Sequence, residues 1–152
     1  LCPLDQWLGE AVAGQPKQEL QLELSTVQAT IQPVALGRAI NNLIDNAFSY
    51  GEAPVVVRLS HNDVEALIEV WDQGPGIPEK QWQRALQPFH RIDAARGQQG
   101  HCGLGLAIVN QVVQQHGGTI SFRRGHGNPG RFAVLLRFPL DGPRKPIFLQ
   151  KT

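Results

Sequence analysis

The sequence predicts an α/β fold: a two-layer α/β sandwich with about three helices packed on one face of a five- to six-stranded mixed sheet. Three observations predict it. Residues 33–50 and the segment that begins at Ala107 each repeat apolar side chains at helical spacing, on one face only. Within residues 64–71 every second side chain, from Val64 to Val70, is apolar, as in strands with one covered face. Residues 119–123 and 132–138 flank a loop rich in Gly, Asn and Pro, which favours a hairpin.

The composition is that of one globular domain. The chain has 152 residues, of which 41% are hydrophobic and 18% charged, enough for one core. A net charge of +1 gives no electrostatic reason to expect nucleic acid as a partner. Cys2 and Cys102 lie far apart without a CxxC motif, so we expect free thiols in a reducing compartment and no structural zinc. The chain starts at Leu1 and contains no Met, so we expect it to be a piece of a longer protein.

The first third of the chain predicts a helix, strands and then a long helix. Pro3 opens a helix over residues 3–14, where apolar side chains recur at helical spacing. Residues 19–24 alternate strictly and predict a half-buried strand, and residues 29–32 add a short second one. Pro33 then begins the long helix.

Two stripes run along this long helix. The apolar stripe, which predicts the core-facing side, consists of Leu36, Ile40, Leu43 and Ala47. The polar stripe beside it consists of Asn42, Asn46 and Tyr50. Asn is a poor helix former, so two in register beside an aromatic favour a binding site over the alternative, a cap or crosslink to a loop. An Asn oxygen also suits Mg²⁺ that phosphates already hold.

The strand over residues 64–71 leads into the stretch DQGPGIP, residues 72–78. Asp72 continues the parity of the apolar face, so its carboxylate is predicted to point to the covered side of the sheet. A buried carboxylate is costly without a donor, and the glycines that follow leave the backbone bare. The stretch is therefore a slot for an amino-bearing ring or, on its own evidence equally, an Asp-initiated turn. Trp71, next to it, is expected to report binding by fluorescence.

The remaining segments surround these two. Residues 53–61 are predicted to pair with residues 64–71, and residues 79–86 to form a short helix that begins after Pro78. Residues 87–102 lack periodicity, which is typical of a lid loop. The glycines that follow this loop lead into a buried helix, and such a helix N-terminus can bind an anion.

Four short motifs of this chain resemble the motifs of a known protein family. Residues 42–47 (NLIDNA) resemble an N box, residues 72–77 a G1 box, residues 88–91 (PFHR) an F box and residues 103–109 (GLGLAIV) a G2 box. In this order they resemble the ATP-binding catalytic domain (HATPase, GHKL superfamily) of bacterial two-component sensor histidine kinases, most of all osmosensor kinases of the EnvZ type. The resemblance implies a Bergerat-type sandwich, with a catalytic domain over residues 1–140 and a C-terminal tail over residues 141–152.

The resemblance also implies roles for individual residues. Asp72 would accept a hydrogen bond from the adenine amino group, and Asn46 would coordinate Mg²⁺ between the phosphates. Tyr50 would lie near the base, and Arg91 would approach the phosphates from the lid. The implied ATP-binding set is Asn42, Asn46, Tyr50, Asp72, Gly74, Gly76, Ile77, Phe89, Arg91, Gly103, Leu104, Gly105 and Leu106.

The pattern also departs from the family. The G2 box usually starts Gly-Ser/Thr-Gly, whereas this chain has His101, Cys102 and Gly103, without the hydroxyl. Related ATPases place a general-base Glu where this chain has Asn42, which cannot take a proton from water. We therefore expect phosphoryl transfer to a protein acceptor and not hydrolysis.

The implied acceptor lies outside the chain. No histidine here is followed by the acidic, basic and Pro pattern of a phosphoacceptor, so we expect no catalytic residue within this fragment and no autophosphorylation by it alone. The implied partners are the dimerisation and histidine-phosphotransfer domain of the same kinase and a response regulator, with the fragment itself monomeric. The implied location is the cytoplasmic side of a bacterial inner membrane. The alternative is a non-catalytic module that binds nucleotide or docks a partner.

Overall fold

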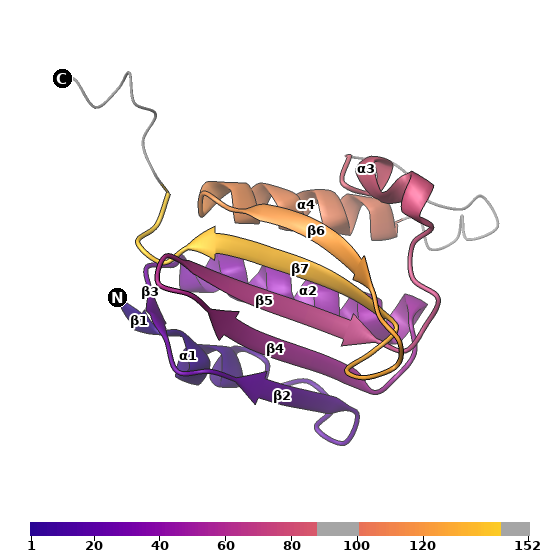
Figure 1. Cartoon of the computed structure of the whole chain (residues 1–152), viewed down its shortest axis with the longest axis horizontal. Coiled ribbons are helices and arrows are strands. Elements are labelled where there is room, and N and C mark those ends of the chain that lie inside the picture. Colours follow the sequence, from indigo (N-terminus) through magenta and orange to yellow (C-terminus); the bar gives the residue numbers. More distant parts are fainter. Residues whose placement is uncertain (88–100, 144–152) are drawn as a thin grey trace.

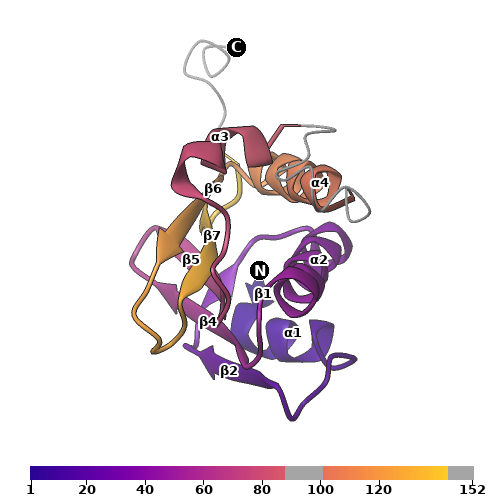
Figure 2. The same ribbon diagram turned by 90° about the vertical axis from the view of Figure 1, so that its right-hand side faces the viewer.

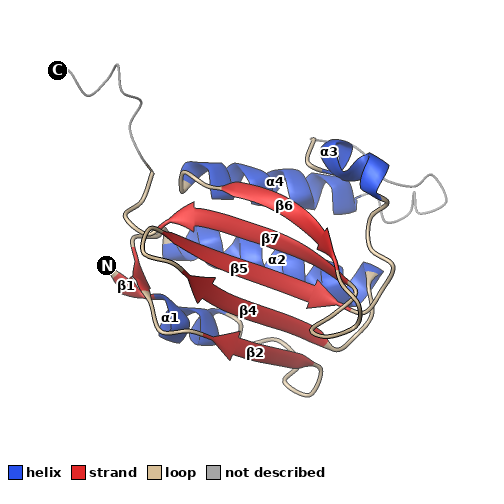
Figure 3. Ribbon diagram, viewed as in Figure 1, coloured by secondary structure: helices blue, strands red, loops and turns tan. Residues whose placement is uncertain are grey.

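Five strands form one mixed sheet in the order β2-β4-β5-β7-β6 (Figure 3). The structure is a computed structural model that describes residues 1–87 and 101–143, apart from the side chains of residues 101–104. The strands are β2 (Leu20–Leu24), β4 (Val55–His61), β5 (Glu65–Asp72), β6 (Thr119–Arg124) and β7 (Phe132–Pro139). β2 runs parallel to β4, and the other three pairs are antiparallel. Two short strands, β1 (Cys2–Pro3) and β3 (Gln28–Ala29), pair separately.

Three helices cover one face of the sheet, as predicted (Figures 1 and 2). They are α1 (Leu4–Ala11), α2 (Pro33–Tyr50) and α4 (His101–Gln115), and α2 packs against α4 over the sheet centre. No helix in the described ranges is long and apolar enough to span a bilayer. The predicted helix 79–86 is a 3-10 turn, η1 (Glu79–Gln81), continued by one α-turn, α3 (Trp82–Ala85).

The predicted α2 stripe faces the core. Leu36, Ile40, Leu43 and Ala47 are all buried against the sheet. Burial contributes roughly 1.5–3 kcal/mol for each of Leu36, Ile40 and Leu43, so this face holds α2 on the sheet more than helix propensity does.

The β5 strand has the predicted parity but two covered faces. Ala66, Ile68 and Val70 are buried on the helix side. On the other side Trp71 is 4% exposed, because the β6–β7 connection folds over it: a Cβ at Gly125 would meet its indole ring. Trp71 therefore lies across the sheet from Asp72, and the expectation that it lies next to the site is wrong.

A buried histidine ties α4 to the start of α2. The backbone N–H of Gln32 donates to His116 Nε2 at 3.0 Å, so Nε2 is the acceptor and the proton is on Nδ1. His116 Nδ1 then donates to the carbonyl of Val112 at 2.8 Å. Both ring nitrogens thus make hydrogen bonds. These bonds lie where α4 ends and α2 begins, at the opposite end of α2 from its last residue, Tyr50 (Figure 1).

Candidate nucleotide-binding site

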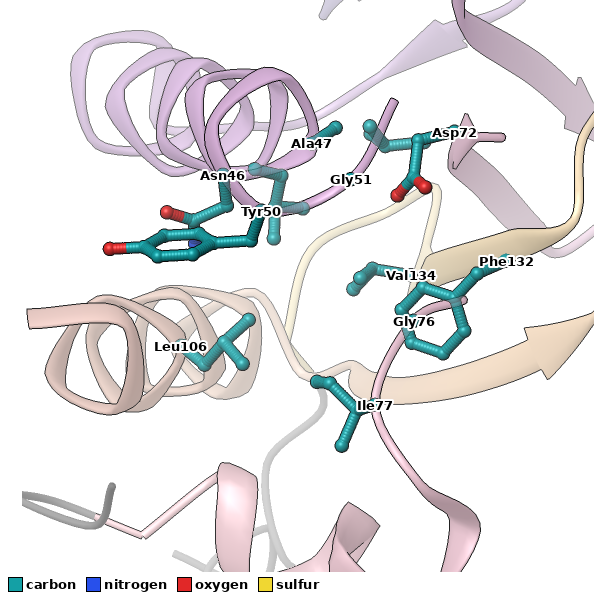
Figure 4. Close-up of a pocket in the computed structure, with 12 residues that line it drawn as sticks. Asn46, Ala47, Tyr50, Gly51, Asp72, Gly76, Ile77, Leu106, Phe132 and Val134 are labelled. Carbon is teal, nitrogen blue, oxygen red and sulfur yellow. The ribbon is translucent and has the colours of Figure 1, made fainter. Parts of the chain in front are cut away.

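A cavity lies between the C-terminal half of α2, the start of α4 and the ends of β5 and β7 (Figure 4). It measures about 560 Å³, including the part that is open to solvent. Its walls are mostly apolar, with a few polar groups from α2 and β5. The lining residues are Leu43, Asn46, Ala47, Tyr50, Gly51, Val70, Asp72, Gly76, Ile77, Leu106, Phe132 and Val134.

The carboxylate of Asp72 points into this space from the last position of β5 (Figure 4). The residue is 6% exposed, and the backbone N–H of Gly74 donates to its Oδ1 at 2.7 Å. A Cβ on Gly51 would collide with the carboxylate, and one on Gly74 would lie 2.8 Å from the Cα of Gly51. Two glycine backbones therefore make room for this acid and leave its acceptor capacity directed at the cavity.

Burial raises the pKa of the Asp72 carboxyl above its ordinary value. Backbone hydrogen bonds from Gly74 and Glu52 act in the opposite direction, and the charge of Glu52 raises the pKa further. No cation pairs with Asp72 among the described residues. A neutral donor that enters the cavity would therefore meet an acceptor that the protein itself satisfies only in part.

The α2 side of the cavity carries an unpaired amide. Asn46 Nδ2 is buried and has no hydrogen-bond partner among the residues that the structure describes, while Tyr50 lies one turn further along the same face (Figure 4). A Cβ on Gly105 would lie 3.8 Å from that Nδ2, so α4 approaches Asn46 where it has no side chain. An amide left unpaired at a cavity wall costs free energy and indicates a place for a ligand.

The rim of the cavity is the loop that follows β5. Gly76 has φ +70°, and a Cβ there would collide with the ring of Phe132. Ile77 follows and faces the cavity, and its carbonyl accepts a hydrogen bond from Trp82 Nε1 at 2.9 Å. Glycine is therefore required at position 76 both by conformation and by space.

The structure brings together most of the predicted residues that it describes. Asn46, Tyr50, Asp72, Gly76, Ile77 and Leu106 line one cavity. Gly74 contacts Asp72 from behind, and Gly105 faces Asn46.

Of the remaining predicted residues, one lines another groove, and the structure does not describe how the other four lie relative to the cavity. Asn42 lies one turn before Asn46 and lines a separate groove between α1 and α2, with Trp7 and Arg38. Gly103 lies inside α4, which begins at His101, so the glycines do not precede the helix as predicted; Leu104 lies there too, and its side chain is not described. Phe89 and Arg91 fall outside the described residues.

Six wall residues are absent from the predicted set, and two of these come from a distant strand. Phe132 is the β7 partner of Asp72, and Val134 is the partner of Val70. The alternation of β7 marks both as inward-facing, but which strand neighbours β5 is not encoded locally.

A metal ion in this site would need ligands beyond the protein. No group of three or more His, Cys, Asp or Glu lies together in the described part of the chain. Asn46 offers a neutral carboxamide oxygen from the cavity wall. This donor set fits Mg²⁺, which keeps waters and phosphate oxygens and takes few protein ligands.

Comparison with known proteins identifies the family. Residues 31–142 match the family described as "Histidine kinase-, DNA gyrase B-, and HSP90-like ATPase". The chain belongs to this family. It is an ATPase domain of the sensor histidine kinase type. The matched range contains both helices and all the β-strand residues that form the cavity.

Relatives narrow the resemblance to sensor kinases. The domain is 45% identical over 116 residues to the signal transduction histidine-protein kinase/phosphatase MprB of Mycolicibacterium smegmatis, covering 73% of this chain and 23% of that protein. The chain thus spans less than a quarter of that relative.

Solved structures share the fold. The mycobacterial sensor histidine kinase MprB has a TM-score of 0.73 at 28% identity, over 91% of this chain and 95% of that one. The histidine kinase domain of the E. coli osmosensor EnvZ has a TM-score of 0.68 at 31% identity, over 95% and 91%. The predicted sandwich and the predicted family are both confirmed.

Proposed function

We propose that this domain binds Mg-ATP in the cavity and supplies the γ-phosphoryl group for autophosphorylation of a histidine on a separate dimerisation domain. The observation that carries the proposal is the buried Asp72 carboxylate, which pairs with no cation in the described part of the chain and faces the amide of Asn46 across an apolar space. The family and the kinase relatives support the same reading.

In this proposal Asp72 selects the base. Its carboxylate accepts a hydrogen bond from the exocyclic amine of adenine, while Val70, Ile77 and Val134 cover the ring. Guanine presents a carbonyl oxygen at the same ring position, and two acceptors facing each other in a buried site repel. The site should therefore prefer adenine to guanine.

Asn46 would hold the metal that accompanies the phosphates. Mg²⁺ neutralises the charge that phosphoryl transfer shifts onto the leaving group. The chain's own part is to offer an uncharged oxygen from α2 and, at Gly105, a helix surface without a side chain. Arg91 and Phe89 stay predictions of the resemblance for the lid side.

The reaction follows from what the helix lacks. Asn42, one turn before Asn46, cannot act as a general base toward water and lines a different groove. We therefore propose transfer to a protein histidine: the bond between the γ-phosphorus and its bridging oxygen breaks, a phosphorus–nitrogen bond forms, and ADP leaves. A response regulator as the next acceptor, and a place on the cytoplasmic side of a bacterial inner membrane, belong to the same proposal.

The test mixes this chain with the matching dimerisation domain and γ-labelled Mg-ATP. Label on the histidine of the added domain supports the kinase function. ATP binding without label on that histidine would instead favour the alternative, a nucleotide-binding or partner-docking module. The chain alone serves as the control and should remain unlabelled.

A further inference from the structure

Arg124 binds the rim of the cavity, the segment Pro75–Ile77, from outside the cavity. It is the last residue of β6, and its cross-strand partner on β7 is Phe132. Its Nη1 donates to the carbonyl of Pro75 at 2.6 Å, and its Nη2 donates to the carbonyl of Ile77 at 2.7 Å. The guanidinium carbon also lies 5.8 Å from the centre of the Phe132 ring, within range of a cation–π contact.

These contacts fix the one residue of the rim that has an unusual backbone. Gly76 lies between the two bonded carbonyls, with φ +70° and no room for a Cβ against Phe132. The loop is thus held between a ring on one side and a planar fork of donors on the other. Such a fork matches two carbonyls with a geometry that an ammonium group cannot reproduce.

The same carbonyl is held from a second direction. Trp82 Nε1 donates to the carbonyl of Ile77, so this oxygen accepts from both Arg124 and Trp82. The ring of Phe122 joins the two sides, with its centre 5.6 Å from that of Trp82 and 5.9 Å from that of Phe132. Trp82, Phe122 and Phe132 thus form a row of neighbouring rings beside the rim. Arg124 lies against Phe132 at one end of this row.

Arg124 does not line the cavity. A bound base would contact Gly76 and Ile77, which do line it, and not the guanidinium. Any effect of Arg124 on nucleotide binding must then pass through the position of the rim.

We propose that Arg124 is a positioning residue for nucleotide binding, which holds the Pro75–Ile77 rim in the conformation that receives the base. The proposal rests on the proposed function, because it assigns the rim to the adenine side of ATP. It predicts an effect on the nucleoside part of the ligand that is independent of the phosphates.

The test compares R124Q with R124K and with the matched control R123Q. Arg123 is the preceding β6 residue, exposed and without a hydrogen bond or ion pair in the described structure. Each variant is titrated by calorimetry with adenosine, Mg-ADP and Mg-ATP. R124Q should weaken all three by the same factor, about tenfold, the scale of one lost charge-assisted hydrogen bond, because Gln has no charge and can hold at most one of the two carbonyls that Arg124 holds. R124K keeps the positive charge without the fork and should recover part of the loss, and R123Q should bind like the original chain.

Three results would overturn the proposal. One is unchanged affinity in R124Q. Another is a loss that grows from adenosine to ATP, which would make Arg124 a phosphate contact. The third is an equal loss in R123Q, which would reduce the effect to general charge.

A measurement without nucleotide separates this proposal from the proposed function. Exchange of the Trp82 indole Nε1 hydrogen, which donates to the rim carbonyl of Ile77 at 2.9 Å, should be faster in R124Q than in R123Q, with circular dichroism confirming that both chains are folded. If the original chain bound none of the three ligands, the proposed function would fall, and the exchange difference would still decide whether Arg124 holds the rim. Equal exchange in both variants would refute the rim contact itself.

Discussion

Replacing Asp72 by Asn tests the base-recognition site directly. Asn can keep the acceptor that Gly74 uses, at 2.7 Å in the original chain, and it removes the charge. A hydrogen bond to a charged group contributes roughly 1.5–3 kcal/mol, so the variant should bind Mg-ATP about ten- to a hundredfold more weakly. The preference for ATP over GTP should fall with it, because the new amide can donate to the guanine carbonyl.

The same substitution should change how the stability of the fold depends on pH. Burial raises the pKa of the Asp72 carboxyl in the folded state, so its favourable contribution to stability is complete below the unfolded value and is lost as pH rises through the folded value. Asn carries no such dependence. Relative to the original chain, the variant should therefore gain free energy of unfolding as pH rises from acid to neutral.

The assays are calorimetric titration with ATP and GTP, and urea unfolding at several pH values. Unchanged ATP affinity in the variant would show that the carboxylate does not meet the base. A variant that loses stability relative to the original chain as pH rises would show that the carboxylate is not buried as described. The two results are independent, since the second needs no nucleotide.

Three further predictions concern the same cavity. Asn46→Ala should remove the Mg²⁺ dependence of ATP affinity and leave adenosine affinity unchanged, as titrations with and without Mg²⁺ would detect; an unaltered Mg²⁺ dependence would exclude Asn46 as a ligand. Gly76→Ala should lower the free energy of unfolding by about 1–3 kcal/mol, because its φ is +70° and its Cβ would collide with Phe132, and urea titration of the nucleotide-free chain measures this. Trp82→Phe should abolish most of any nucleotide-dependent change in tryptophan fluorescence, because Trp82 bonds the rim, whereas Trp71→Phe should keep it; the reverse pattern would place the reporter on the far face.

The parts of the site that the sequence predicts are those that depend on local periodicity. Asp72 follows the inward parity of β5, and Asn46 lies beside the core stripe of α2; both side chains reach the cavity. The prediction for Trp71 is wrong because it relies on adjacency in the sequence and not on the alternation of the strand. Trp71 precedes Asp72 directly and for that reason lies on the opposite face of the sheet.

Features that depend on strand order could not be predicted in the same way. Phe132 reaches the cavity because β7 pairs with β5, and Arg124 reaches the rim because β6 pairs with β7. The hairpin of β6 and β7 is predicted from the loop between them, but the pairing of β7 with β5 does not follow from the neighbouring sequence, since about 60 residues separate Asp72 from Phe132. Asn42 is predicted to share the site with Asn46, which lies four residues later. It faces α1 and not the cavity, because four residues turn a helix by slightly more than one full turn.

The imidazole of His116 has a mechanical consequence for the domain. It joins α4 to the residue before α2, whereas Asn46 and Leu106 lie toward the opposite end of this antiparallel pair, about 20 Å away along α2 at 1.5 Å per residue. The two helices are therefore held together by this histidine at one end of the pair. A nucleotide whose metal-bound phosphates lie between Asn46 and Gly105 would spread the helices at that end, and the end held by His116 would keep its packing.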